Sequence, residues 1–172
     1  ASDVYKRQAV HLGFWVAGDM LDQSEIPTSG SASMSGKAVF NVAYRYNQAN
    51  SDYGVTQYSS NATVNGTFNW GSGSYSGQLD FTNFDSGNSL VSNAGFTSFS
   101  VSLAGSGATY AGSLNDTNNG WTREAVIAGA LYGNNTPVES GGRISVGLSK
   151  SGSLGTSGAN DFYMAEGIYL ID

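Results

Sequence analysis

From residue 12 onward, apolar and polar side chains alternate with a period of two, and this alternation constrains the fold more than any other feature. Between Lys37 and Tyr46, one side of an extended chain carries only alanine, valine and aromatic side chains. Successive side chains of a β-strand point to opposite faces, so this stretch is predicted to be a strand with one dry and one wet face. Such strands are typical of antiparallel sheets and not of sheets covered by helices.

The same alternation, bounded by turns of Gly, Ser, Asn and Asp, predicts further strands along the chain. Together with residues 37–46, the predicted strands are 12–18, 55–70 (bent or bulged near Asn65 and Gly66), 74–81, 96–103, 108–114, 125–132, 143–148 and 162–171, with a turn at 116–120. Nine candidates with hairpin-length gaps favour a closed meander, because closure removes exposed strand edges.

The predicted fold is therefore all-β: a single antiparallel eight-stranded up-and-down barrel over about residues 36–171, with residues 12–18 as an additional N-terminal strand segment. The inward positions are rich in Tyr, Phe and Leu, which predicts a filled barrel. A β-sandwich is the alternative, because periodicity does not separate the two folds. The predicted division is an N-terminal tail with the apolar strand segment (1–25) and the barrel domain (26–172).

Residues 1–8 match nothing downstream and hold two of the seven basic residues. They resemble translations of sequencing adapters at the ends of metagenomic reading frames. That interpretation makes residues 1–8 non-native and places the true N-terminus outside the chain. An ordinary disordered tail is the alternative.

The chain has 172 residues and few charges: seven Lys and Arg against thirteen Asp and Glu, a net charge of −6. Without a basic stripe there is no electrostatic footprint for nucleic acid, and an anionic membrane surface would repel the chain. No apolar run approaches the ~20 residues of a transmembrane helix, so no transmembrane segment is predicted. The low-charge surface of Ser, Thr, Asn and Gly favours an extracellular or outer cell-surface location.

No enzymatic activity is predicted. His11 is the single histidine, so a Ser–His–Asp arrangement would depend on this one residue. Glycosidase-type catalysis needs two acids across a cleft, and Asp80 with Asp85 or Glu124 with Glu139 are the candidate pairs. Thirteen scattered acids favour solvated carboxylates instead. No cofactor is predicted, because the chain has no cysteine and His11 is a lone haem-ligand candidate with no clear pocket.

Residues 116–120 resemble the opening of a calcium loop, with Asp116 and Asn118 as candidate ligands; residues 83–87 do so less well. Neither stretch carries the glutamate at position twelve that the helical calcium loop requires. Asn, Asp and Gly are also the residues of tight turns. The sequence therefore predicts no metal site beyond this weak calcium candidate.

Three stretches resemble a known family. Residues 75–81 are similar to a strand with tyrosine–x–glycine and aspartate–phenylalanine, and residues 110–114 to the hairpin strand that follows it. Residues 127–133 followed by 137–142 resemble a strand ending in aromatic–glycine, a proline loop, and glutamate–x–glycine–glycine. These patterns, with similar residues at 26–30 and 34–38, are those of the transferrin-binding-protein-like β-barrel family of Gram-negative bacterial surface proteins.

The resemblance spans about residues 26–171 and implies an eight-stranded barrel, no catalysis, and a binding or scaffolding role, without identifying the partner. The sequence departs from the family in two ways. The lipidated cysteine is absent, and the turn from Gly120 to Glu124 lacks the charged loops with which relatives grip a host protein.

Exposed aromatic residues near strand ends and loops often mark contact surfaces. The candidates are Phe14, Trp15, Tyr53, Tyr58 and Trp121. Trp15 leads because its strand has no evident place inside a complete eight-stranded barrel. The alternative is that such aromatics cap the mouths of the barrel.

These observations predict a non-enzymatic, extracellular or cell-surface binding or adhesion module that recognises a protein or a small ligand. The alternative is a structural subunit that assembles with copies of itself into a filament or matrix. In that case the N-terminal strand would complete a neighbour's sheet by β-augmentation.

Overall fold

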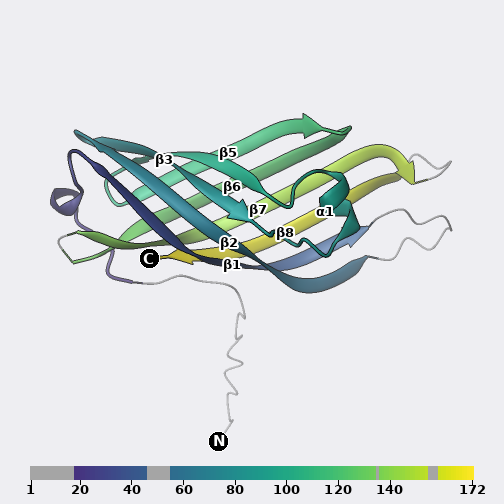
Figure 1. Cartoon of the computed structure of the whole chain (residues 1–172), viewed down its shortest axis with the longest axis horizontal. Helices are drawn as coiled ribbons and strands as arrows, with labels where there is room; N and C mark the ends of the chain where they lie inside the picture. Colours follow the sequence, from purple (N-terminus) through teal and green to yellow (C-terminus); the bar gives the residue numbers. More distant parts are fainter. Residues whose placement is uncertain (1–17, 46–54, 135, 155–158) are drawn as a thin grey trace, which may run out of the picture.

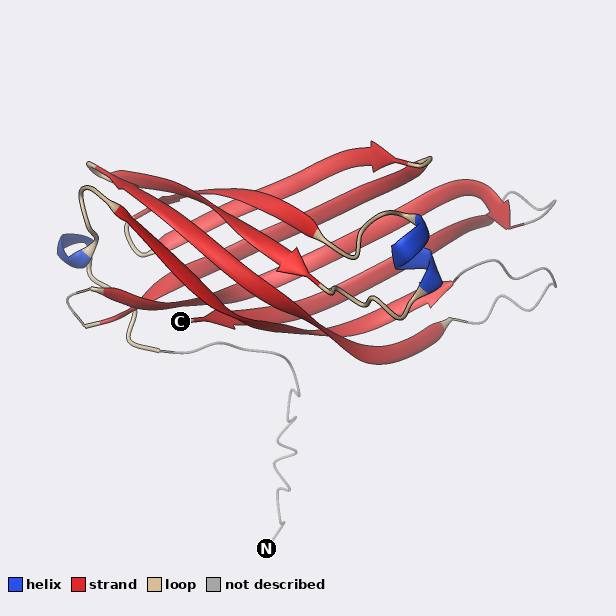
Figure 2. Ribbon diagram, in the orientation of Figure 1, coloured by secondary structure: helices blue, strands red, loops and turns tan. Residues whose placement is uncertain are grey.

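The computed structural model describes residues 18–45, 55–134, 136–154 and 159–172, which form one closed antiparallel barrel of eight strands (Figure 1, Figure 2). Each strand pairs with its neighbours in sequence, and β1 pairs with β8 to close the barrel. The elements are η1 Gln23–Glu25, β1 Ser31–Arg45, β2 Thr56–Gly71, β3 Ser74–Thr82, α1 Ser89–Asn93, β4 Phe99–Ser106, β5 Thr109–Asn118, β6 Trp121–Gly133, β7 Pro137–Leu154 and β8 Ala159–Ile171. The predicted all-β, up-and-down barrel is confirmed.

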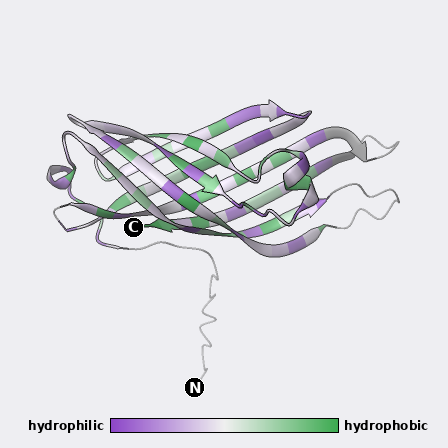
Figure 3. Ribbon diagram, viewed as in Figure 1, coloured by the Kyte–Doolittle hydropathy of each residue, from purple (hydrophilic) through white to green (hydrophobic). Residues whose placement is uncertain are grey.

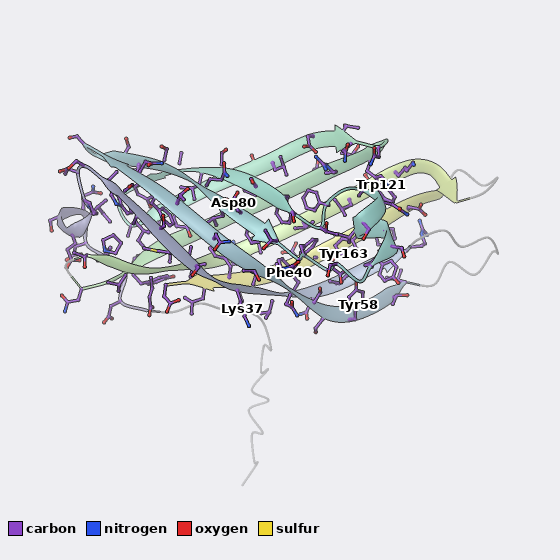
Figure 4. All side chains as sticks on the ribbon, viewed as in Figure 1. Lys37, Phe40, Tyr58, Asp80, Trp121 and Tyr163 are labelled. Atoms are coloured by element: carbon purple, nitrogen blue, oxygen red, sulfur yellow. The ribbon has the colours of Figure 1, made fainter. Side chains whose placement is uncertain are left out.

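The period-two pattern maps onto the two faces of the barrel wall. Ala38, Phe40 and Val42 are buried in β1, whereas Lys37 and Asn41 are exposed. Figure 3 shows apolar and polar residues alternating along the strands, and Figure 4 shows Phe40 inside the barrel and Lys37 outside it. The interior is therefore the hydrophobic core, as predicted for a filled barrel.

The outer face is mostly small and polar, with Ser76 and Asn41 as typical exposed residues. No helix in the described part of the chain is long and apolar enough to cross a membrane.

Several strands extend beyond their predicted ends: β1 begins at Ser31, and β7 runs from Pro137 to Leu154. At Asn65 and Gly66, β2 pairs with β1 and β3 without a shift in register, so the bulge is absent there, and the predicted alternative of a bend stays a prediction. Gly66 instead makes room in the core: a Cβ at this position would lie 2.6 Å from Cδ1 of Ile171.

One end of the barrel, which we call the η1 end, is covered by residues 19–26. Leu21 donates a backbone hydrogen bond to Leu131 (3.3 Å), and Gly133 donates one to Asp19 (3.0 Å). These bonds attach the chain to the last residues of β6, and the Leu21 side chain is buried in the core. The predicted strand at 12–18 lies outside the described residues except for Gly18.

The opposite end, the α1 end, is covered by the connection between β3 and β4. The Asn88 side chain accepts a hydrogen bond from the Leu90 backbone N–H and caps the first turn of α1. Leu90 and Val91 are the buried residues of α1 itself. The sequence did not predict α1, because five residues are too few to show helical periodicity.

Candidate binding site

The centre of the barrel is filled by large side chains. Phe40 lies edge-on against Phe84, with 4.9 Å between ring centroids, and Phe81 stacks on Phe99 at 4.8 Å. Tyr169 is fully buried beside Phe81. These rings fill the interior of the barrel, so we looked for candidate sites at its ends and on its outer face.

A buried carboxylate, Asp85, lies at the α1 end and is 9% exposed. Tyr58 and Tyr163 both donate hydroxyl hydrogen bonds to its Oδ2, the latter at 2.9 Å, and Ser60 donates to Oδ1 at 3.0 Å. Asn88 in turn donates to the Tyr58 hydroxyl at 2.8 Å. The group joins β2, β8 and the start of α1 (Figure 4).

Burial is the main cause that raises the pKa of both Tyr58 and Tyr163 above the ordinary 10.0, and the neighbouring Asp85 raises each further. Both hydroxyls therefore stay protonated at neutral pH and remain donors to the carboxylate. Three donors to one carboxylate form a satisfied structural cluster, since buried polar groups need partners.

A second polar cluster attaches the tip of the β5–β6 hairpin to α1. Arg123 donates from Nε and Nη2 to the two carboxylate oxygens of Asp116, both at 2.6 Å. Its Nη1 donates to the backbone carbonyls of Ala94 (3.3 Å) and Gly95 (3.0 Å). Asn118 also donates to the Ala94 carbonyl, at 3.3 Å. Hydrogen bonding from Arg123 holds the pKa of Asp116 below its usual value.

This cluster engages the side chains of both candidate calcium ligands, Asp116 and Asn118. The carboxylate of Asp116 is engaged by a guanidinium, and the side-chain amide of Asn118 points its donor at a carbonyl. Within the described residues, no three His, Cys, Asp or Glu side chains gather as a set that could hold a metal ion. Asp116 and Asn118 thus fasten the hairpin to the helix.

The barrel wall is incompletely paired between β4 and β5. Their register covers only four pairs, from Leu103 opposite Gly112 to Ser106 opposite Thr109. Residues 99–102 of β4 and 113–118 of β5 have no register partner across this boundary, although β5 pairs with β6 along its whole length. We call this unpaired stretch the open seam; it lies in the half of the barrel nearer α1, where the β5–β6 hairpin runs on (Figure 2).

The backbone groups that face the open seam follow from strand geometry. The Ala108 carbonyl accepts a hydrogen bond from Leu131 of β6, and alternate residues of a strand turn their backbone groups to the same side. Asn115 and Thr117 therefore turn their N–H and C=O groups away from β6 and toward the seam. Their side chains are exposed, and Leu114 between them is only partly buried.

A shallow groove of about 550 Å³ lies on the outer face of β1, β2 and β8. Asn41, Gln57, Met164 and Glu166 are among its lining residues. Met164 is 56% exposed, which makes the groove a mixed apolar and polar surface.

The aromatic contact candidates fall in different places. Tyr58 is partly buried in the Asp85 cluster. Trp121 is only 2% exposed and lies in the hydrophobic core, with the Lys150 Nζ 5.8 Å from its ring centroid; its role as a contact residue stays a prediction. Phe14, Trp15 and Tyr53 lie outside the described residues, as does His11.

The candidate carboxylate pairs do not converge. Asp80 contacts Gln78 and Ser100 on the outside of the wall, whereas Asp85 is buried at the barrel end. Glu139 lies opposite Tyr132, eight positions along β6 from Glu124, which is about 26 Å at 3.3 Å per residue.

At the open seam, the backbone groups of Asn115 and Thr117 have no strand partner in the register of β4 and β5. Such edge groups template the pairing of another strand. Both β4 and β5 continue beyond their four shared pairs, so no pattern within either strand signals where their pairing stops. No protein-family model and no curated protein matches this chain.

Proposed function

We propose that this protein is a non-enzymatic binding module of an extracellular or outer cell-surface kind, which recognises an extended segment of a protein partner. The open seam carries this proposal. Asn115 and Thr117 present backbone donors and acceptors on a strand that the rest of the barrel holds rigid. An added strand gains affinity from main-chain hydrogen bonds and specificity from alternate side chains.

The filled interior supports a protein partner over a small ligand. Phe40, Phe81 and Tyr169 occupy the space in which small barrels of this size hold a ligand. The resemblance of β3, β5 and the β6–β7 connection to transferrin-binding-protein-like barrels, together with the low-charge outer face, supports the surface location and the binding role.

A second candidate, self-assembly through the N-terminal segment, is favoured by a specific observation. Met20 forms an isolated antiparallel bridge with Tyr132 at the end of β6, flanked by the backbone hydrogen bonds of Asp19 and Leu21. The apolar stretch that precedes them, residues 12–18 with Phe14 and Trp15, is predicted to be a strand by its sequence pattern, and the eight described strands close the barrel among themselves.

Selection from a phage-displayed random peptide library on the purified protein tests the binding role. We expect enriched peptides that alternate apolar residues and lose binding when Thr117→Pro removes a seam-facing N–H. Proline is tolerated at an edge position whose N–H is free, and Thr117→Ala, which keeps the N–H, is the matched control. No enrichment, or equal binding to the Pro variant, contradicts the proposal.

A further inference from the structure

We propose that the open seam accepts residues 12–18 of a second copy of this chain, so that copies join head to tail. This inference rests on the self-assembly candidate above and names its acceptor. Three observations carry it: the ends of the barrel at which donor and acceptor lie, the length of the donor segment, and its side-chain pattern.

Donor and acceptor are at opposite ends of the barrel. The chain reaches the barrel at Asp19, which accepts a hydrogen bond from Gly133 at the η1 end. The open seam is in the half nearer α1, because β4 and β5 pair only near their Ser106–Thr109 turn. Gly18, the first described residue, lies against Tyr132 at the η1 end, so the donor segment is attached to the chain at the end away from the seam.

The length of the segment disfavours insertion into its own seam. Ser113, the first seam residue of β5, lies opposite Val126, seven positions along β6 from Gly133, or about 23 Å at 3.3 Å per residue. Residues 12–18, fully extended, span about the same distance. The apolar stretch would be used up in reaching the seam of its own barrel, with nothing left to pair there. The seam of a neighbouring copy has no such limit.

The chemistry of the seam suits the donor. Asn115 and Thr117 supply main-chain partners, and their side chains are short and exposed on the outer face. Asp116 and Asn118, which alternate with them, are engaged with Arg123 and the Ala94 carbonyl, so the incoming strand pairs with the backbone of Asn115 and Thr117. Leu114, on the inward side, is partly exposed, and an apolar side chain of the incoming strand would cover it. The segment Leu-Gly-Phe-Trp-Val-Ala-Gly carries no charge, so pairing buries no unpaired ionic group.

Head-to-tail contacts between different surfaces give rings or open filaments, whereas a shared patch gives closed dimers. Here the donor is at the η1 end and the acceptor is nearer the α1 end, so each added copy presents a new free seam. The expected product is an open chain of barrels whose length grows with concentration.

The test uses the full chain and two variants, one altered in the donor segment and the other at the acceptor edge. Trp15→Asp places a charge in the donor segment, and Thr117→Pro blocks the acceptor edge; Thr117→Ala is the matched control. In sedimentation velocity we expect wild type and Thr117→Ala to form concentration-dependent assemblies and each of the other variants to stay monomeric. Mixing Trp15→Asp with Thr117→Pro should give a one-to-one complex that grows no further, because one partner has only an intact acceptor and the other only an intact donor.

A measurement on the wild type tests the inference independently of how well the Thr117→Pro variant folds. Hydrogen exchange at the Asn115 and Thr117 amides should slow as concentration rises, while exchange at exposed turn amides such as Gly73 stays unchanged. A wild type that remains monomeric, assembly of the Trp15→Asp variant, or seam amides indifferent to concentration overturns the inference. Monomeric wild type with library peptides still captured at the seam would overturn this inference alone, whereas failure of both experiments removes the binding role as well.

Discussion

The Tyr163 hydroxyl donates a 2.9 Å hydrogen bond to the Asp85 carboxylate and thereby joins β8 to the connection between β3 and α1. Tyr58 and Ser60 of β2 donate to the same carboxylate. One acidic side chain thus fastens three parts of the chain at the α1 end. The cluster holds in place the connection between β3 and β4, which covers the core at this end. The β5–β6 hairpin, which borders the open seam, is fastened to the same connection by Arg123.

Replacing Asp85 with Asn should destabilise the barrel by about 1–3 kcal/mol, because the amide nitrogen of Asn is not an acceptor and leaves a buried tyrosine hydroxyl without its partner. Asp85 has a positive φ of 40°, a conformation that Asn tolerates, so the substitution tests the hydrogen bonds and not the backbone. Urea unfolding measures the change. Asp80→Asn on the outer wall is the control, and equal losses for the two variants would contradict the proposed role of Asp85.

The barrel should lose stability in alkaline solution. Burial raises the pKa of Tyr163 and Tyr169 above the ordinary 10.0. A raised pKa in the folded state means that the neutral hydroxyls contribute stability fully below pH 10, where tyrosines of the unfolded chain are also neutral. This contribution falls as the pH rises above that value, because unfolding then releases protons.

Absorbance of tyrosinate and urea midpoints, followed together through this range, check the expectation. Exposed tyrosines should ionise first, and the buried ones should ionise only as the barrel unfolds. A single titration of all tyrosines near pH 10 with the fold intact would show that the buried hydroxyls are accessible and would refute it.

The contribution of the Asp116–Arg123 pair to folding stability should depend on pH in the acid range. Hydrogen bonding from Arg123 lowers the pKa of Asp116, so the ionised carboxylate contributes stability at neutral pH that is lost as the pH falls through the lowered value. Wild type should exceed Asp116→Asn in urea midpoint at neutral pH, and the gap should close on acidification. The gap should be small, since the Asp116 side chain is 38% exposed and solvent screens such pairs. A gap that persists at low pH would mean that packing, not charge, holds the hairpin tip.

The sequence predicted the wall of the barrel because period-two alternation is a local property that each strand carries by itself. The ends of the strands were less predictable. In residues 31–36, for example, Ser and Gly surround Ala32 and Met34 and weaken the apolar signal, yet β1 begins at Ser31. The turn at Asn119 and Gly120 was anticipated by composition, and both residues have the positive φ that such turns require.

The site was harder to predict because its parts are distant in sequence. Tyr163 and Asp85 are 78 positions apart, and nothing local marks a carboxylate that will accept hydrogen bonds from two strands, β2 and β8. The open seam depends on where the pairing of β4 with β5 stops, which is a property of two strands together. The predicted turn at residues 116–120 ended β5 too early and concealed its unpaired edge.

Trp121 offers the clearest contrast between a contact residue and a core residue. Its side chain is 2% exposed and belongs to the hydrophobic core at the α1 end. Trp121→Ala should therefore cost about 3–5 kcal/mol of folding stability, as truncation of a buried Trp does, and should lower the melting temperature of the monomer. Thr122→Ala, at the exposed neighbouring position, should change stability by less than about 0.5 kcal/mol. Thermal unfolding by circular dichroism measures both. If Trp121→Ala instead melts like wild type and loses only partner binding or assembly, Trp121 is an exposed anchor in solution, and the tip of the β5–β6 hairpin opens to present it.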